Sequence, residues 1–112
     1  MPKLILLVRR RDDFTHEEFA DRYESGHAPL ARRTLPKLRK YVRNYLTPVP
    51  GIPELNFDCC TEFWFDSQGD LEETLAWYAT EEGQVLVRDE AEFMDRDSMR
   101  AFITQETELT NN

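Results

Sequence analysis

The stretch Phe57-Asp58-Cys59-Cys60-Thr61-Glu62-Phe63-Trp64-Phe65 is strongly β-like and does most to decide the fold. Successive side chains of a strand point to opposite faces of a sheet. One face then carries Phe57, Cys59, Thr61, Phe63 and Phe65, and the other carries Asp58, Cys60, Glu62 and Trp64. Cys59 and Cys60 therefore cannot easily share a metal ion, and a disulfide between neighbouring residues would be strained. We expect two reduced thiols, no metal site and a cytoplasmic protein.

Three further segments have strand patterns. Residues Lys3–Arg9 are apolar on both faces, as in a central strand that is covered on both sides. Residues Lys37–Thr47 alternate and predict a long strand, and residues Met99–Thr104 predict a short closing strand.

Helix signals separate these strands. Thr15 and Glu18 form a capping box, which predicts a helix start, and Gly26 is placed to end that helix with a left-handed cap. Pro29 suits the first turn of a second short helix, which should end by Pro36.

The second half of the chain repeats this arrangement, with helix starts at Ser67 and Thr80. The whole order predicts the α+β class and the ferredoxin-like split βαβ topology, a four-stranded antiparallel sheet with helices on one face. The first and third strands lie in the centre of such a sheet. Its other face would leave Trp64 and Cys60 uncovered, so we expect a homodimer.

Length and composition limit the class of protein. The 112 residues suffice for one domain, which we place at residues 1–105, followed by a loose polar tail at residues 106–112. No apolar run approaches the ~20 residues of a membrane-spanning helix, and no secretory signal is recognisable at the amino terminus. The net charge of −8 argues against nucleic-acid binding, because an acidic chain repels phosphate backbones.

The charge is unevenly distributed along the chain. Residues 25–53 contain no acid and six cations, which are Arg32, Arg33, Lys37, Arg39, Lys40 and Arg43. Residues 54–112 carry 16 acids against three arginines. This asymmetry is typical of an anionic-ligand site or a complementary subunit contact, although solvated faces of one chain also balance each other in this way.

Four segments resemble, in order, those of the EthD family. They are Phe19–Leu30 (FADRYESGHAPL), Tyr41–Asn44 (YVRN), Thr61–Asp66 (TEFWFD) and Asp89–Asp95 (DEAEFMD). The resemblance runs along nearly the whole chain and implies a dimeric α/β barrel of ferredoxin-like subunits. It implies no single reaction: characterised relatives include fungal dehydratases and decarboxylases of aromatic polyketides. Sister families contain muconolactone isomerases, polyketide cyclases and cofactor-free monooxygenases.

His27 is the first candidate for chemistry. Imidazole, with an ordinary pKa of about 6.5, is well suited to take and return a proton near neutral pH. The residue lies just past the expected helix end, in a turn that can face a cavity, and the resemblance implies a histidine at this position. A histidine that caps the helix carbonyls explains the position equally well.

Glu62 and Asp89 are two further candidates. Glu62 lies in the middle of a strand, where an unpaired carboxylate is costly to bury, so it could orient the imidazole, hold a substrate hydroxyl or pair with Arg43. Asp89 falls on the apolar stripe of its helix, so it lines the cavity or pairs with an arginine of residues 25–53.

The aromatic side chains are numerous enough to stack on a flat ligand, and tyrosine hydroxyls can bind phenols or ketones. The candidates are Tyr23, Tyr41, Trp64, Tyr78 and Phe93, each of which could also be an ordinary core residue. The Pro- and Gly-rich segment Pro48–Pro53 is a candidate lid or rim.

Together these residues and the resemblance to the EthD family imply a small cofactor-independent enzyme that acts on a hydrophobic aromatic or polyketide-like substrate, and the specific reaction rests on that resemblance. His27 would move a proton next to a carbonyl, or assist the loss of water or carbon dioxide, with Glu62, Asp89 or a tyrosine orienting it. Two alternatives stay open. One is a non-catalytic ligand-binding or accessory protein, and the other is a cofactor-free monooxygenase that uses Trp64 or tyrosines in place of His27.

Overall fold

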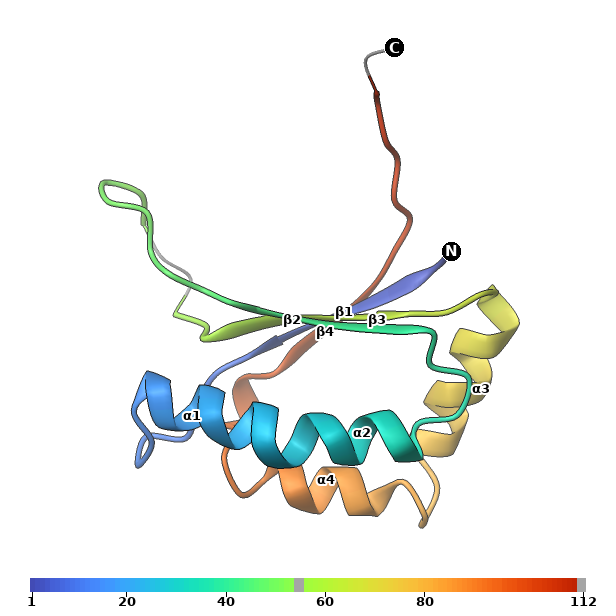
Figure 1. Ribbon diagram of the computed structural model, residues 1–112, viewed down its shortest axis with the longest axis horizontal. Coiled ribbons are helices and arrows are strands. Elements are labelled where there is room, and N and C mark those ends of the chain that lie inside the picture. The colour runs from blue at the N-terminus through green and yellow to red at the C-terminus, as the bar shows by residue number, and fades with distance from the viewer. Residues whose placement is uncertain (54–55, 111–112) are drawn as a thin grey trace.

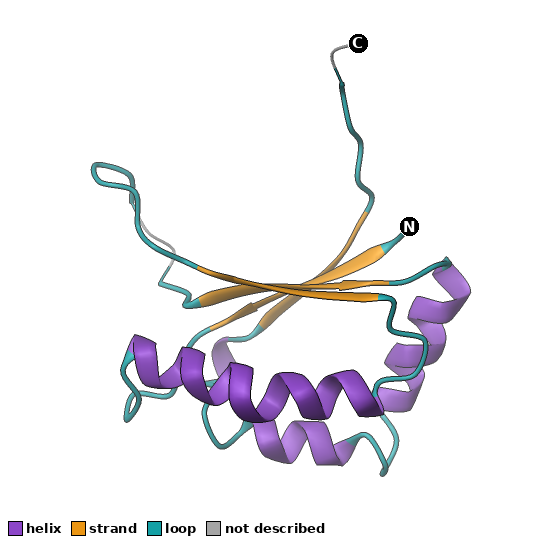
Figure 2. Ribbon diagram, in the orientation of Figure 1, coloured by secondary structure: helices purple, strands orange, loops and turns teal. Residues whose placement is uncertain are grey.

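Four strands form one antiparallel sheet, and the helices pack on a single side of it (Figures 1 and 2). The computed structural model describes residues 1–53 and 56–110. The strands are β1 (Lys3–Val8), β2 (Lys40–Tyr45), β3 (Cys59–Trp64) and β4 (Arg100–Thr104), in the spatial order β2-β3-β1-β4. The helical elements are α1 (His16–Arg22), the π turn η1 (Tyr23–His27), α2 (Ala28–Thr34), α3 (Gln68–Tyr78), α4 (Gln84–Glu90) and the short 3-10 turn η2 (Arg96–Ser98). The predicted α+β class and the central positions of the first and third strands are confirmed.

The core lies between the sheet and the helices. Along β3, Cys59, Thr61 and Phe63 are buried on this side, whereas Cys60 and its alternate neighbours are only partly buried on the other. Both cysteines are free thiols, as the alternation predicts. One apolar cluster centres on Phe19, Tyr23 and Phe93, and a second centres on Phe63, Phe65 and Leu71.

Two of the helices begin at the predicted caps. The side-chain oxygen of Thr15 accepts a hydrogen bond from the backbone amide of Glu18. The carboxylate of Glu18 accepts one from the backbone amide of Thr15, so the capping box of α1 is complete. At the start of α3, the hydroxyl oxygen of Ser67 accepts a hydrogen bond from the backbone amide of Asp70.

Two elements are shorter than predicted. β2 spans Lys40–Tyr45 rather than residues 37–47, because Lys37 takes a left-handed φ of 63° and breaks the strand. α4 begins at Gln84 rather than at Thr80. The backbone amide of Gly83 donates a hydrogen bond to the carbonyl of Thr80 (N to O, 3.1 Å), which forms a turn before the helix.

The predicted helix end at Gly26 is wrong, since the chain continues helically from α1 through η1 into α2. The amide of Ala28 donates to the carbonyl of Tyr23, which is the wider bond of a π turn. Pro29 follows, has no amide hydrogen of its own, and starts the regular turns of α2. His27 is therefore the last residue of a π turn inside a long helical run and not part of a loop.

Two non-helical segments extend on the other side of the sheet. Residues 46–53 after β2 and residues 105–110 after β4 both project away from the helices (Figure 1). The candidate lid Pro48–Pro53 consequently does not cover the space between sheet and helices. Within the part of the chain that the structure describes, no helix has the length and apolarity that crossing a membrane requires.

Candidate functional site

An apolar cavity of about 200 Å³ lies between the sheet and the helices. Most of its lining is apolar, with Leu4 and Leu6 from β1, Phe63 from β3 and Leu86 from α4. Five polar side chains complete the lining, and they are His27, Thr74, Tyr78, Glu90 and Arg96. An apolar space with a few convergent polar groups is the usual composition of a small-ligand site.

His27 reaches this cavity from η1 and is only 4 % exposed. Its Nδ1 lies 2.8 Å from Oδ2 of Asp89, and its Nε2 lies 3.9 Å from Oε2 of Glu90. Because an ionised carboxylate only accepts hydrogen bonds, the contact with Asp89 places a proton on Nδ1. Nε2 is then the nitrogen that is available for chemistry, and it faces the side of Glu90.

Asp89 orients the imidazole and is itself held by Arg22, whose Nη2 lies 2.5 Å from Oδ1 and whose Nη1 lies 3.3 Å from Oδ2. Burial alone would raise the pKa of Asp89, but the hydrogen bonds from Arg22 and His27 outweigh it and hold this pKa below its usual value. The alternative pairing with an arginine of residues 25–53 is wrong, because the guanidinium comes from α1. Gly26 leaves the space that this guanidinium needs, since a Cβ at residue 26 would lie 2.5 Å from Nη1 of Arg22.

Glu90 is a site residue that the sequence patterns do not single out. It is 5 % exposed, and its Oε1 accepts hydrogen bonds from the hydroxyl of Tyr78 (2.8 Å) and from Nε of Arg96 (3.1 Å). Burial and the adjacent carboxylate raise the pKa of Tyr78 to about 12, so the phenol stays protonated and donates. The available signal is its spacing, because Glu90 lies four residues after Leu86 and so shares its apolar face.

The predicted aromatic residues have different places in the structure. Tyr23 and Phe93 are core residues, 1 % and 0 % exposed, and their rings lie 5.6 and 5.5 Å from the imidazole that they pack against. The hydroxyl of Tyr23 lies 2.9 Å from that of Thr61. Tyr41 stacks on Phe63 at 4.9 Å and donates to the hydroxyl of Tyr23. Of the five candidates, Tyr78 is the one that lines the cavity.

Glu62 and Trp64 do not join the cavity, because their places in β3 point them to the face of the sheet away from the helices. Glu62 accepts hydrogen bonds from Asn44 (2.9 Å) and Lys3 (3.3 Å), which lower its pKa against the effect of burial. The amino group of Lys3 also lies 4.5 Å from the centre of the Trp64 ring. The predicted partner Arg43 does not contact Glu62 and binds another carboxylate.

No group of three or more His, Cys, Asp and Glu side chains within residues 1–53 and 56–110 is arranged to hold a metal ion. The residues that converge on the cavity are instead suited to proton transfer and to binding an uncharged ring.

The EthD domain profile matches residues 11–97 of the sequence. The chain belongs to the EthD family. Among solved structures, this EthD protein is similar to an ethyl tert-butyl ether d (ethd) family protein from Bacillus halodurans. The two are 27 % identical over 96 % of this chain and 99 % of that one, with a TM-score of 0.72.

Two more distant structures share the fold. A protein from Arabidopsis thaliana is 14 % identical over 99 % of this chain and 100 % of that chain, with a TM-score of 0.72. A dimeric protein of unknown function and ferredoxin-like fold from Bacteroides fragilis is 19 % identical over 94 % and 95 % of the two chains, with a TM-score of 0.61. Among curated proteins, none matches this sequence. The predicted family and the ferredoxin-like fold are thus confirmed.

Proposed function

We propose that this EthD protein is a small cofactor-independent enzyme in which His27 performs general acid–base chemistry on a hydrophobic aromatic or polyketide-like substrate. The observation that carries the proposal is one imidazole placed between Asp89 and Glu90 in the lining of an apolar cavity. Isomerisation, cyclisation, dehydration and decarboxylation all need a proton to move at or near a carbonyl, which one positioned imidazole can do.

The hydrogen bonds of the site support this role for Nε2. Asp89 occupies Nδ1 at 2.8 Å, so Nε2 carries the lone pair that accepts a substrate proton. The resulting imidazolium lies between two carboxylates, whose charges stabilise it. Glu90 acts through its charge, because 3.9 Å is too long for a hydrogen bond to Nε2, and this leaves Nε2 free for the substrate.

The volume of the cavity limits the substrate. At about 200 Å³ it exceeds the ~150 Å³ of an engineered cavity that binds benzene, so a substituted ring fits. Leu4, Leu6 and Phe63 supply apolar contacts to such a ring. Arg96 lines the same space, and its positive charge would stabilise an enolate that forms when a proton leaves the carbon next to a carbonyl.

The test uses 2-indanone, a small aromatic ketone, and follows deuterium exchange at the carbon next to its carbonyl by NMR in heavy water. The wild-type protein should accelerate the exchange, and His27→Gln should lose at least about 100-fold of that acceleration. His16→Gln is the matched control, because it makes the same change at a surface histidine outside the cavity. This control should keep the wild-type rate.

Other outcomes would contradict the proposal. Exchange by His27→Gln at the wild-type rate would exclude the histidine as the base. Binding of aromatic ketones without any exchange would support the ligand-binding alternative, and oxygen consumption that survives His27→Gln would support the monooxygenase.

We also propose that a second copy covers the open face of the sheet. This face carries Ile5, Leu7 and Phe102, and Phe102 is 51 % exposed although large apolar side chains are normally covered. The loop after β2 and residues 105–110 extend from the same face, where they would flank a partner (Figure 1). A related fold from Bacteroides fragilis is described as dimeric. We further propose a cytoplasmic location, which the two free thiols support.

A further inference from the structure

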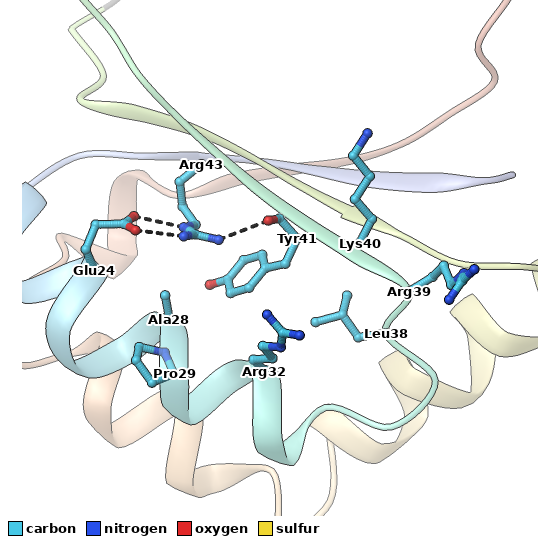
Figure 3. A pocket seen from close by; sticks show the side chains of 9 residues that line it. All are labelled: Glu24, Ala28, Pro29, Arg32, Leu38, Arg39, Lys40, Tyr41 and Arg43. Carbon is cyan, nitrogen blue, oxygen red and sulfur yellow. Dashed lines mark hydrogen bonds and ion pairs between the residues drawn. The ribbon is translucent and has the colours of Figure 1, made fainter.

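A second hollow lies between α2 and the edge strand β2, apart from the cavity that His27 lines (Figure 3). It has a volume of about 600 Å³ and is partly open to solvent. Its charged side chains are Arg32, Arg39, Lys40 and Arg43 against a single carboxylate, Glu24. We call it the α2–β2 groove. Since it lies between α2 and the helix-facing side of β2, a partner on the open face of the sheet would not fill it.

Arg43 is not available to a ligand in this groove. Its guanidinium donates to both carboxylate oxygens of Glu24, at 2.7 and 2.8 Å, and to the carbonyl of Tyr41 at 3.0 Å. These hydrogen bonds lower the pKa of Glu24, so the pair is charged and internally neutral at neutral pH. The other charged side chains of the lining, Arg32, Arg39 and Lys40, are therefore all cations.

Arg32 is the cation that points into the groove. Its side chain rises from α2 towards Tyr41 and Leu38, whereas Lys40 extends away from the helix (Figure 3). Within residues 1–53 and 56–110, Arg32 makes no ion pair, and Arg39 makes one weak pair of 3.4 Å with an exposed aspartate.

Among the described residues, 1–53 and 56–110, Arg33, Arg88 and Arg100 also make no ion pair, so what distinguishes Arg32 is its place in the groove. Carboxylate partners are present for Arg9, Arg10, Arg11, Arg22, Arg43 and Arg96. Apart from Glu24, the residues that line the groove all belong to the acid-free segment 25–53. A local positive field within an acidic protein concentrates small anions at this place.

The rest of the lining is apolar. Ala28 and Pro29 of α2 form one side, and Leu38 and the ring of Tyr41 form the other (Figure 3). Tyr41 is held rigidly, since its ring stacks on Phe63, the guanidinium of Arg43 lies 4.7 Å from the ring centre, and its hydroxyl is hydrogen-bonded. A ligand that matches both features has an acidic group for the guanidinium of Arg32 and an apolar body that packs against Pro29 and Leu38.

We propose that the α2–β2 groove binds small amphipathic anions, namely carboxylates or phosphate esters of an apolar ring. The acid group pairs with Arg32, and the ring packs against Pro29 and Leu38. The groove is separate from the cavity that His27 lines, and its test measures binding rather than turnover. The result therefore stands or falls independently of the chemistry proposed for His27.

The experiment titrates isotope-labelled protein with three probes and follows the backbone amide shifts by NMR. 2-Naphthoate and 2-naphthyl phosphate present the two acids, and 2-naphthamide is the neutral control. We expect the anions to shift residues 28–32 and 38–43 and to bind more weakly at high salt, and the amide to have no effect there. The tighter of the two anions identifies the acid that the groove prefers.

Two variants separate a built site from overall charge. Arg32→Gln should weaken binding of the anions about fivefold, as expected for one partly exposed charge-assisted contact. Arg33→Gln removes the same charge from the same helix but does not line the groove, so it should change affinity less than about twofold. Equal effects of the two variants, equal binding of the amide, or shifts centred on His27 and Tyr78 would each overturn the proposal.

Discussion

Replacing Gly26 by alanine should break the contact between Arg22 and Asp89 that orients His27. A Cβ on Gly26 would lie 3.3 Å from Cζ of Arg22, which is a tight contact, and 2.5 Å from Nη1, which is closer than such atoms can approach. The nearest atoms all belong to this one side chain, which is flexible. We therefore expect the guanidinium to move away while the helical backbone stays in place.

Two opposing contributions set the size of the effect. Alanine stabilises a helix interior by about 0.5–1 kcal/mol relative to glycine. Losing a charge-assisted hydrogen bond costs about 1.5–3 kcal/mol, and little of this is screened because the side chains of Arg22 and Asp89 are only 26 % and 19 % exposed. The loss exceeds the gain, so Gly26→Ala should lower the free energy of unfolding by about 1–2 kcal/mol.

The assay is urea unfolding of a double-mutant cycle in which the second change is Arg22→Met. Without the guanidinium there is nothing for the new methyl group to displace, so Gly26→Ala should be neutral or stabilising by up to about 1 kcal/mol in that background. The reasoning is refuted if the alanine destabilises both backgrounds to the same extent. Exchange of the 2-indanone protons should also slow in Gly26→Ala, because His27 loses its fixed partner.

The remaining predictions concern titration and thiol reactivity. Because the pKa of Asp89 is lowered by Arg22 and His27 in the folded state, its stabilising contribution is complete above its unfolded pKa, near 3.8, and is lost as pH falls through the folded value. Urea midpoints should therefore fall less steeply with acidification in Asp89→Asn than in the wild type, and equal slopes would contradict the pairing. Burial raises the pKa of Cys59 to about 12, so dithionitrobenzoate should not label it until the protein unfolds. Labelling of Cys60, on the open face, should slow as protein concentration rises, and a constant rate would argue against the proposed dimer.

Much of the fold was predictable because its signals are local. The alternation in β3 separates Thr61 from Glu62 without knowledge of any other strand. The capping box at Thr15 starts α1 by hydrogen bonds within one turn. The order of elements then restricts the topology to few choices, and the uncovered face follows from that topology.

Gly26 shows where such reasoning fails. A glycine before an Ala-Pro sequence fits a helix end by local rules. Its actual role is to leave room for Arg22, and that arginine is in turn held by Asp89 on a helix far along the chain. The requirement comes from tertiary packing, so no local pattern reveals it.

The candidate site was predictable only in part for the same reason. His27 and Asp89 stand out by residue type and by position on an apolar stripe, and they do meet. Glu62 stands out as well, but strand alternation directs it to the opposite face. Glu90 matters because α4 packs against η1 and so brings this carboxylate to His27, and contacts between distant segments have no sequence spacing that predicts them.

The charged neighbours of His27 form two ion pairs that position the imidazole. Two carboxylates flank the ring, and each has its own cation, Arg22 for Asp89 and Arg96 for Glu90. Because each carboxylate has a guanidinium beside it, neither is left in this largely buried place without a cation. Arg22 and Arg96 also fix the two carboxylates by hydrogen bonds, and Asp89 in turn holds Nδ1 of the imidazole. The two arginines thus act on the proposed base indirectly: they hold the carboxylates that keep its Nδ1 bound and its Nε2 beside Glu90.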